Sequence, residues 1–360
     1  MVEEWRERGR RATGALMAAS LLVAGIGVSQ VVMSAREAKG APAVESAATV
    51  LDPRGERFAG PAAPSRVPAT TTTTVAPTTT VPPTTTTTAP PHRFTMEPYK
   101  GLGAWLDVYD WTASYAQHGP ALEPDVVDTL AAQGVQTLYI QASKWNAPED
   151  VLEPARLIAF IDRAHQRGIS VIGWYLPTYE DPGRDLQRLL AIAALPVDGL
   201  AVDIEATNVR DVVERNRRVV EVSNALRAAL PGEVLGAIPL EPILIEDINP
   251  RYWPGFPWAE LAPSYDVWLP MAYWTNRRGP WRDAYSYMAA NIDRVRAHVG
   301  RPDAPIHALG GIGDVTSVED LQGFRRAALE RSVLGGSIYD FRTTQAPHWP
   351  ELLPFRELRK

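Results

Sequence analysis

The sequence predicts an α/β fold, a (β/α)8 TIM barrel, over residues 99–345. Eight short apolar runs alternate in this region with segments whose apolar residues recur at helical spacing. The region is close to the ~250 residues that eight such units occupy in barrels of this kind. An open doubly wound sheet that binds a dinucleotide would carry a Gly-rich phosphate turn after its first strand, and the sequence has none there.

The expected strands are short runs rich in apolar and β-branched residues. Strands that alternate with helices indicate a parallel sheet, because the chain must cross back before each new strand begins. In chain order the expected strands cover residues 103–109, 135–141, 169–176, 200–204, 234–240, 265–273, 305–309 and 333–339.

The expected helices carry apolar residues three and four positions apart, and Gly168 and Pro231-Gly232 end two of them. Residues 241–264 interrupt the alternation, because they are irregular, rich in Pro and Trp, and contain no complete helical pattern. The expected helices cover residues 126–133, 154–167, 185–194, 212–230, 284–299 and 318–331.

An apolar segment precedes the barrel region. Residues 14–33 are almost all apolar, and arginines precede them within residues 1–13. About 20 apolar residues are enough to cross a bilayer as a helix, and the arginines favour a cytoplasmic N-terminus. We therefore expect a membrane anchor that leaves the C-terminal domain outside the cell. A cleaved signal peptide is the alternative, and the domain would then be secreted.

A linker is expected over residues 34–98, because residues 61–91 are nearly all Thr, Pro, Ala and Val and cannot build a core. Pro-rich chain of this kind extends by ~3.1 Å per residue, which gives a reach of roughly 100 Å. Thr beside Pro is also typical of O-glycosylated stalks. At the other end of the barrel, residues 346–360 are expected to form a C-terminal tail.

Composition excludes several classes of function. The net charge is −6, which provides no basic surface for nucleic acid. The chain has no cysteine, so disulfides, thiolate metal sites and a cysteine nucleophile are ruled out. The six histidines show no metal-ligand spacing, and no glycine loop that could hold a phosphate is present. We expect neither a metal nor a cofactor.

Two carboxylates close the fourth expected strand. Asp203 and Glu205 are two positions apart, so on a strand they share a face and lie roughly 7 Å apart. Active sites of (β/α)8 barrels lie at the carboxyl ends of the strands, which makes the two acids a candidate catalytic pair. In the alternative interpretation, one acid caps the next helix and the other pairs with a surface arginine.

Other acids and aromatic rings follow the remaining strands. Asp107 and Tyr109 are expected to share a face at the end of the first strand, with Asp107 directed into the barrel opening. Aromatic rings, acids and amides together are typical of sugar-binding sites, although any single Trp could instead pack a loop against the barrel. The candidate substrate-binding residues are Asp107, Tyr109, Gln141, Trp174, Glu241, Met271, Trp274 and Tyr339.

Three of these strands resemble those of family 18 glycoside hydrolases, the chitinase family. Residues 198–205 read DGLAVDIE and resemble the DGxDxDxE signature, residues 271–273 read MAY and resemble MxY, and residues 335–339 read GGSIY and resemble GGxMxW. The resemblance implies that Glu205 is the general acid and that Asp203 orients the substrate's N-acetyl group, which acts as the nucleophile. It also implies that Tyr273 contacts that group.

The chain departs from the family 18 pattern at three positions. Ala201 replaces the middle Asp of the signature, which in the family shares charge with the acid that corresponds to Asp203. Trp274 stands where the family usually has Asp or Asn, and Tyr339 replaces the Trp of the eighth strand.

A second resemblance is to family 25 lysozyme-like barrels, which use D-x-E on a central strand and an Asp on strand one. Asp203-Ile204-Glu205 and Asp107-Val108-Tyr109-Asp110 are similar to that arrangement. Family 25 cleaves peptidoglycan, so this resemblance implies a cell-wall substrate.

The sequence therefore predicts an extracytoplasmic, retaining glycoside hydrolase that acts on a polysaccharide containing N-acetylhexosamine. The alternative is a pseudoenzyme of the same fold that binds glycan without cleaving it. Transglycosylation would use the same carboxylates. Deacetylation of the common metal-dependent kind needs a His-His-Asp set, which we do not find.

Overall fold

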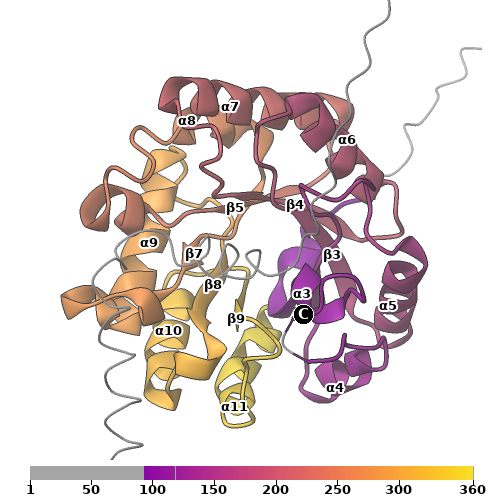
Figure 1. Cartoon of the computed structure of the whole chain (residues 1–360). Helices are drawn as coiled ribbons and strands as arrows, with labels where there is room; N and C mark the ends of the chain where they lie inside the picture. The colour runs from indigo at the N-terminus through magenta and orange to yellow at the C-terminus, as the bar shows by residue number, and fades with distance from the viewer. Residues whose placement is uncertain (1–92, 118, 360) are drawn as a thin grey trace, which may run out of the picture. The chain divides into compact units, whose positions relative to one another are not determined.

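The computed structural model describes residues 93–117 and 119–359. This part of the chain forms one curled parallel sheet surrounded by helices, in the strand order β6-β5-β4-β3-β2-β1-β9-β8-β7 (Figure 1). The arrangement is an α/β fold consistent with a (β/α)8 barrel. The strands are β1 Gly101–Leu106, β2 Thr137–Gln141, β3 Ser170–Tyr175, β4 Gly199–Ile204, β5 Leu235–Pro239, β6 Val267–Trp268, β7 Met271–Ala272, β8 His307–Ile312 and β9 Gly335–Tyr339.

The sixth expected strand is broken into two short strands. Residues 265–273 were expected to be continuous, but β6 and β7 are separated by Leu269 and Pro270. Proline lacks the N–H that a ladder needs, which accounts for the break. β6 pairs with β5 and β7 pairs with β8, while Trp268 forms an isolated parallel bridge with Ile306. The two ends of the sheet therefore meet at this point of the ring.

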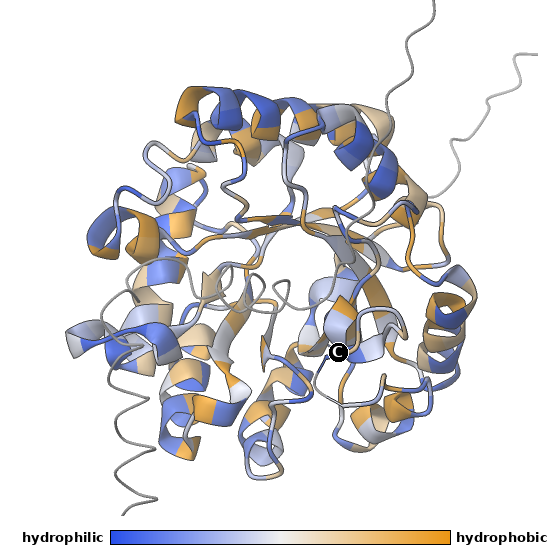
Figure 2. Ribbon diagram, viewed as in Figure 1, coloured by the Kyte–Doolittle hydropathy of each residue, from blue (hydrophilic) through white to orange (hydrophobic). Residues whose placement is uncertain are grey.

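Helices lie outside the sheet, with apolar faces toward it and polar faces outward (Figure 2). This is the amphipathic pattern that the sequence spacing predicts. Asp211 caps one of these helices by accepting hydrogen bonds from the backbone N–H groups of Val213 and Glu214. The α-helices of the described residues are α3 Val108–Trp111, α4 Val126–Ala132, α5 Pro154–Gln166, α6 Pro182–Ala193, α7 Val212–Ala229, α8 Trp258–Leu261, α9 Ala284–His298, α10 Val318–Glu330 and α11 His348–Leu352.

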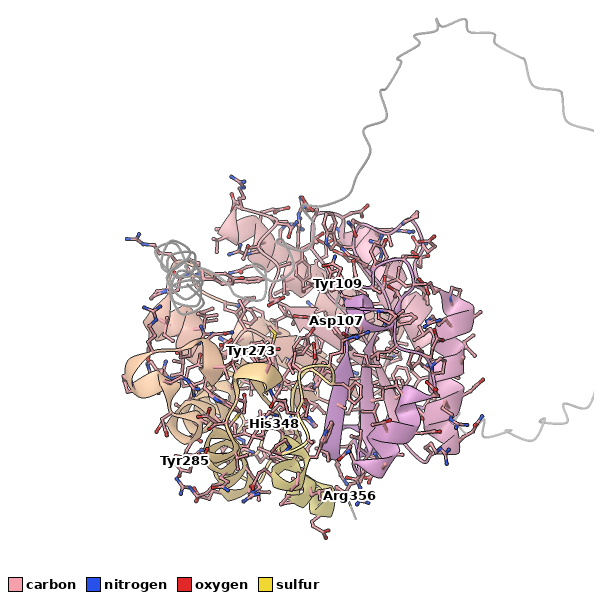
Figure 3. The ribbon with its side chains drawn as sticks, turned by 60° about the horizontal axis from the view of Figure 1, so that its bottom comes forward. Asp107, Tyr109, Tyr273, Tyr285, His348 and Arg356 are labelled. Carbon is pink, nitrogen blue, oxygen red and sulfur yellow. The ribbon has the colours of Figure 1, made fainter. Side chains whose placement is uncertain are left out.

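Both ends of the described chain pack at the amino ends of the strands. Phe94 is buried, and its carbonyl accepts a hydrogen bond from the Val234 N–H just before β5. Residues expected to be a tail form α11 and a 3-10 helix, Leu353–Leu358, which buries Phe355 against Gly336. Figure 3 shows Arg356 at the end of the barrel opposite Asp107.

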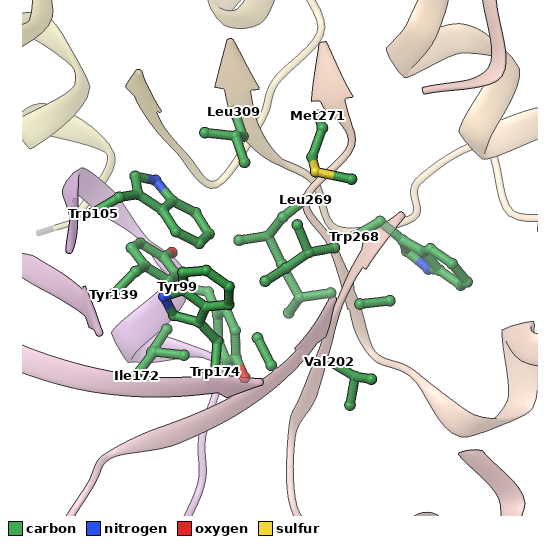
Figure 4. Close-up of a cluster of buried hydrophobic side chains, with 14 of the residues drawn as sticks. Tyr99, Trp105, Tyr139, Ile172, Trp174, Val202, Trp268, Leu269, Met271 and Leu309 are labelled. Atoms are coloured by element: carbon green, nitrogen blue, oxygen red, sulfur yellow. The ribbon is translucent and has the colours of Figure 1, made fainter. Parts of the chain in front are cut away.

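Large aromatic and aliphatic side chains fill the centre of the barrel (Figure 4). A polar chain crosses this core: the Trp105 indole N–H donates to Ser337 Oγ, 2.8 Å away, and Ser337 Oγ lies 2.9 Å from His307 Nε2. His307 Nδ1 lies 2.9 Å from the carbonyl oxygen of Tyr99, which can only accept, so Nδ1 carries the proton. Burial lowers the pKa of His307 to about 4, and the ring is therefore neutral.

The Pro- and Trp-rich connection between β5 and β6 contains a π-helical turn, Leu244–Ile248, and α8. The absence of a full-length helix there agrees with the sequence pattern. Within residues 93–117 and 119–359, no helix combines the length and hydropathy needed to cross a bilayer. The expected cytoplasmic segment 1–13, the apolar segment 14–33 and linker residues 34–92 lie outside the described residues.

Candidate active site

The two acids at the end of β4 are buried. Asp203 is the last polar residue of β4, and Glu205 is the first residue after the strand. The exposed fraction is 6% for Asp203 and 2% for Glu205. Burial and then the nearby charge of Glu205 raise the pKa of Asp203 well above its usual range. The two carboxylates are thus buried at the same strand end, where the charge of Glu205 opposes ionisation of Asp203.

Tyr273 extends the site from a different strand of the ring and lies just after β7. Burial first, and then the charges of Glu205 and Asp203, raise the pKa of its hydroxyl well above 10. The Tyr273 hydroxyl is therefore within electrostatic reach of both acids. The three residues expected to be catalytic thus lie at the same end of the barrel, which we call the rim.

A second tyrosine links Tyr273 to the acids after β1. The rings of Tyr273 and Tyr339 lie 6.0 Å apart, and the Tyr339 hydroxyl donates to Asp107 Oδ2 at 2.8 Å. Figure 3 shows Asp107, Tyr109 and Tyr273 near one another at the same end of the molecule. The expected contribution of Asp107 and Tyr339 to the rim agrees with this placement.

Asp107 and Tyr109 do not share a strand face, which corrects the expectation from the sequence. β1 ends at Leu106, and Asp107 is the N-cap of the single-turn helix α3, where its side chain accepts from the Tyr109 N–H. Asp110 completes a capping box by accepting from the Asp107 N–H. The pair Asp107-x-x-Asp110 is the sequence pattern that could have shown this helix start.

Two further acids of the rim, Asp110 and Asp340, were not among the candidate site residues. Carboxylate oxygens of Asp107, Asp110 and Asp340 lie within 4.8 Å of one another, and all three residues are buried. Arg342 Nε lies 3.0 Å from Asp110 Oδ1. Burial and the charges of Asp107 and Asp340 raise the pKa of Asp110 to about 8. We assign this acid cluster a structural role where α3 meets the end of β9.

Trp174 belongs to the aromatic interior just below the rim. It packs edge-on against Trp105 at 5.9 Å, and Trp105 stacks on Tyr139 at 4.2 Å (Figure 4). Trp105 also lies 6.4 Å from the Tyr339 ring. Ring-to-ring contacts therefore continue from Trp174 through Trp105 and Tyr339 to Tyr273.

Two expected substrate contacts are core residues instead. Trp274 is fully buried between the sheet and α10, with its ring 5.2 Å from Phe324 and directly over Gly310. It follows Tyr273 by one position and is the first residue of a 3-10 helix, Trp274–Asn276. Met271 lies in the apolar cluster of the barrel interior (Figure 4).

Two polar candidates are occupied by contacts within the protein. The Gln141 side-chain oxygen accepts from the Val108 N–H at 3.2 Å and so fixes the start of α3. Glu241 is ion-paired with Arg277 and accepts from the Tyr287 hydroxyl at 3.0 Å. Both side chains support rim elements.

Ala201 lies on the same face of β4 as Asp203, one pleat closer to the centre of the barrel. It is fully buried, and the glycine beside it on β5, Gly236, leaves it little free space. An added Cβ on Gly236 would lie 3.2 Å from the Ala201 methyl group. The carboxylate that the resemblance leads one to expect here is therefore replaced by close apolar packing.

The sequence matches no protein-family model and no curated protein sequence. Solved structures share the fold. An endo-1,4-β-D-mannanase from Thermotoga petrophila aligns with a TM-score of 0.51 and 11% identity, over 72% of this chain and 99% of that one. The spore cortex-lytic enzyme of Bacillus cereus aligns with a TM-score of 0.54 and 9% identity, over 71% and 74% of the two chains. A class V chitinase from Pseudomonas fluorescens gives 0.50 and 11%, over 72% and 99%.

The rim thus holds a pair of buried carboxyl groups, a phenol within electrostatic reach of them, and a group of aromatic rings. A carboxyl group whose pKa is raised can act as a general acid. Tyr252, which sequence reasoning also missed, lies in the irregular segment after β5, and the charge of Glu205 acts on its hydroxyl. The sequence of residues 241–264 did not predict that Tyr252 lies near Glu205, because this irregular segment has no periodicity from which its path could be inferred.

Proposed function

We propose that the protein is a glycoside hydrolase whose general acid is Glu205. The observation that carries the proposal is the buried Asp203–Glu205 pair at the carboxyl end of β4, where burial and mutual charge raise the pKa of Asp203. Barrel enzymes place their chemistry at this end of the strands. Structural neighbours named as a mannanase, a chitinase and a cortex-lytic enzyme support the same class of reaction.

The substrate we propose is a polysaccharide that contains N-acetylhexosamine, as the family 18 resemblance implies. Glu205 gives its proton to the glycosidic oxygen as the bond to C1 breaks, and the carbonyl oxygen of the N-acetyl group forms a bond to C1. Asp203 accepts from the N–H of that group, and Tyr273 contacts its carbonyl oxygen. Water then attacks C1 as the bond between C1 and the N-acetyl carbonyl oxygen breaks, and the water gives a proton to Glu205, which restores the acid and retains the anomeric configuration.

For location, we propose that the domain works outside the cell. The arginines and the apolar run within residues 1–33 support an anchor or a secretion signal, and the Thr/Pro-rich composition of residues 61–91 supports a spacer. A cell-wall or capsular glycan is the polymer within reach of such a domain.

The decisive test is Glu205→Gln, assayed for release of reducing ends from soluble chitin and from peptidoglycan. We expect turnover to fall at least ~100-fold, since general acid catalysis contributes 10²–10⁴-fold. Asp203→Asn should cause a loss of similar size. The matched control is Glu260→Gln, an exposed glutamate of α8. Unchanged turnover in Glu205→Gln, with the fold intact by circular dichroism, would remove Glu205 from the role.

A second candidate is a glycan-binding protein that does not cleave, and Ala201 is the observation that favours it. Asp203 lacks the acid that would share its charge one pleat below. If purified protein pulls down with cell walls but releases no reducing ends from either substrate, binding without hydrolysis is the better description.

A further inference from the structure

Tyr252 has a buried hydroxyl that makes no hydrogen bond to any residue the structure describes. The residue lies between β5 and β6 and is 9% exposed. A buried hydroxyl without a partner costs free energy, so such groups are normally satisfied by water, an ion or a ligand. The Tyr252 hydroxyl is therefore a donor for which the described part of the protein supplies no acceptor.

The segment around Tyr252 is fixed to α7. The guanidinium of Arg215 lies 4.2 Å from the centre of the Trp253 ring, and its Nη2 donates to the Tyr252 carbonyl oxygen at 3.3 Å. Asn216 holds the same segment twice: its Oδ1 accepts from the Trp253 indole N–H and its Nδ2 donates to the Gly255 carbonyl, both at 2.7 Å. Two consecutive residues of α7 thus clamp residues 252–255, and these contacts fix the position of Tyr252.

This clamp holds Tyr252 on the side of the rim where Glu205 lies. The end of β5 is tied to the end of β4 by a hydrogen bond from the Leu240 N–H to the Ile204 carbonyl, 3.4 Å long. Burial first, and then the charges of Glu205 and Glu241, raise the pKa of Tyr252 well above 10. The phenol therefore keeps its proton at all ordinary pH values and acts as a hydrogen-bond donor.

In the described structure, the nearby carboxylates do not accept a hydrogen bond from the Tyr252 hydroxyl. Glu241 has its own donors, the guanidinium of Arg277 and the hydroxyl of Tyr287. We propose that Tyr252 is a substrate-binding residue whose hydroxyl donates a hydrogen bond to a sugar oxygen held beside Glu205. The identity of the ligand as a glycan rests on the function proposed above. The location of the donor does not depend on it.

The test measures binding without turnover, in the Glu205→Gln background. The probe is the β-1,4-linked tetramer of N-acetylglucosamine, and its Kd is measured by isothermal titration calorimetry. Adding Tyr252→Phe should weaken binding about 5- to 10-fold, as expected for one hydrogen bond of about 1 to 1.4 kcal/mol. The matched control is Tyr285→Phe, because Tyr285 donates to Glu330 on the outer helices.

A second variant separates positioning from folding. Asn216→Ala removes both of its contacts with residues 253–255, so it should weaken tetramer binding although it leaves the phenol in place. Thermal melts of all variants identify any loss of fold. In the protein with Glu205 intact, Tyr252→Phe should raise KM more than it lowers kcat, because a ground-state contact is lost.

The outcomes distinguish this inference from the function on which it rests. If the intact protein cleaves the glycan and Tyr252→Phe leaves both Kd and KM unchanged, the role of Tyr252 is refuted and the glycosidase proposal stands. If the intact protein neither cleaves glycans nor binds the tetramer, the proposed substrate class is wrong and the role of Tyr252 in binding it is wrong too.

Discussion

At the scale of single residues, the site depends on where carboxylates can keep a proton. Asp203 and Glu205 are both buried, and burial together with the charge of Glu205 makes ionisation of Asp203 harder. The same physics operates in the acid cluster after β1, where Asp110 is raised to a pKa of about 8 by burial, Asp107 and Asp340. The two groups differ in what they face: the first faces Tyr273, and the second faces Arg342.

Asp110 supports a prediction about stability and pH. Its pKa is about 8 in the folded protein and ~3.9 in an unfolded chain, so the folded state binds the extra proton between these values. The stability this provides is complete below about pH 4 and is lost as the pH rises through about 8. Between these pH values the free energy of unfolding of the wild type should fall as the pH rises. In Asp110→Asn this slope should be smaller by up to ~1.4 kcal/mol per pH unit.

Urea unfolding of wild type and Asp110→Asn at pH 5, 6, 7 and 8 measures this difference. Asn can still accept from the Asp107 N–H, so the start of α3 is preserved. Parallel curves for the two proteins across that range would contradict the shifted pKa.

At the residue scale, strand alternation predicted which acids share a face at the end of β4. Asp203 is the penultimate residue of β4 and Glu205 directly follows the strand, so the two are two positions apart. Tyr273 directly follows β7. Trp274 is one position further on and points to the opposite side, where it packs on Phe324. Its place among the aromatic residues at strand ends made Trp274 a sugar-contact candidate, and the apolar spacing of the sequence does not show the 3-10 helix that it begins.

At the scale of elements, helices and most strands follow the sequence pattern within a few residues. α5 covers Pro154–Gln166 where residues 154–167 were expected, and β4 covers Gly199–Ile204 where residues 200–204 were expected. The differences occur where one residue overrides periodicity. Pro270 breaks the sixth strand, and Asp107 starts a helix where a strand was expected to continue. The spacing of apolar residues does not reveal a missing backbone donor at a proline or a side chain that caps a helix.

The cap of α7 gives a prediction at this scale. Asp211 accepts from the Val213 N–H at 2.9 Å and the Glu214 N–H at 3.1 Å, so Asp211→Ala leaves two helix-start donors to water. We expect a loss of about 1 kcal/mol in the free energy of unfolding, measured with urea. Arg210→Ala, one residue earlier and exposed, serves as the control and should change stability little. Equal stability of the two variants would mean that the cap contributes nothing.

At the scale of the whole molecule, the folded domain extends past the boundaries expected from the sequence. The sequence places the barrel at residues 99–345, whereas Phe94 and residues 348–358 contribute buried side chains to it. The C-terminal segment is short and shows no helical or strand periodicity, so its role became visible only through packing. Gly336 is the partner that makes room for the Phe355 ring.

Truncation after residue 345 is therefore expected to destabilise the domain severely. It would remove the buried side chains of Leu352 and Phe355, and single deletions of such side chains cost roughly 2–5 kcal/mol each. Phe355→Ala alone should lower the free energy of unfolding by about 3–5 kcal/mol. Denaturant unfolding of the full chain, the truncated chain and Phe355→Ala measures the three stabilities. A truncated chain as stable as the full one would show that residues 346–360 are dispensable for the fold.

The entry point of the chain gives the molecule a direction. Arg93 and Phe94 join the barrel beside Glu233 and Val234, at the amino ends of the strands, whereas Asp203 and Glu205 are at the carboxyl ends. Whatever precedes residue 93 is attached to the end that carries no candidate catalytic residue. A protein held by its N-terminus would consequently present its acids to material on the far side of the domain. For the same reason, immobilising the protein on a bead through its N-terminus should leave a long polymer free to approach the rim.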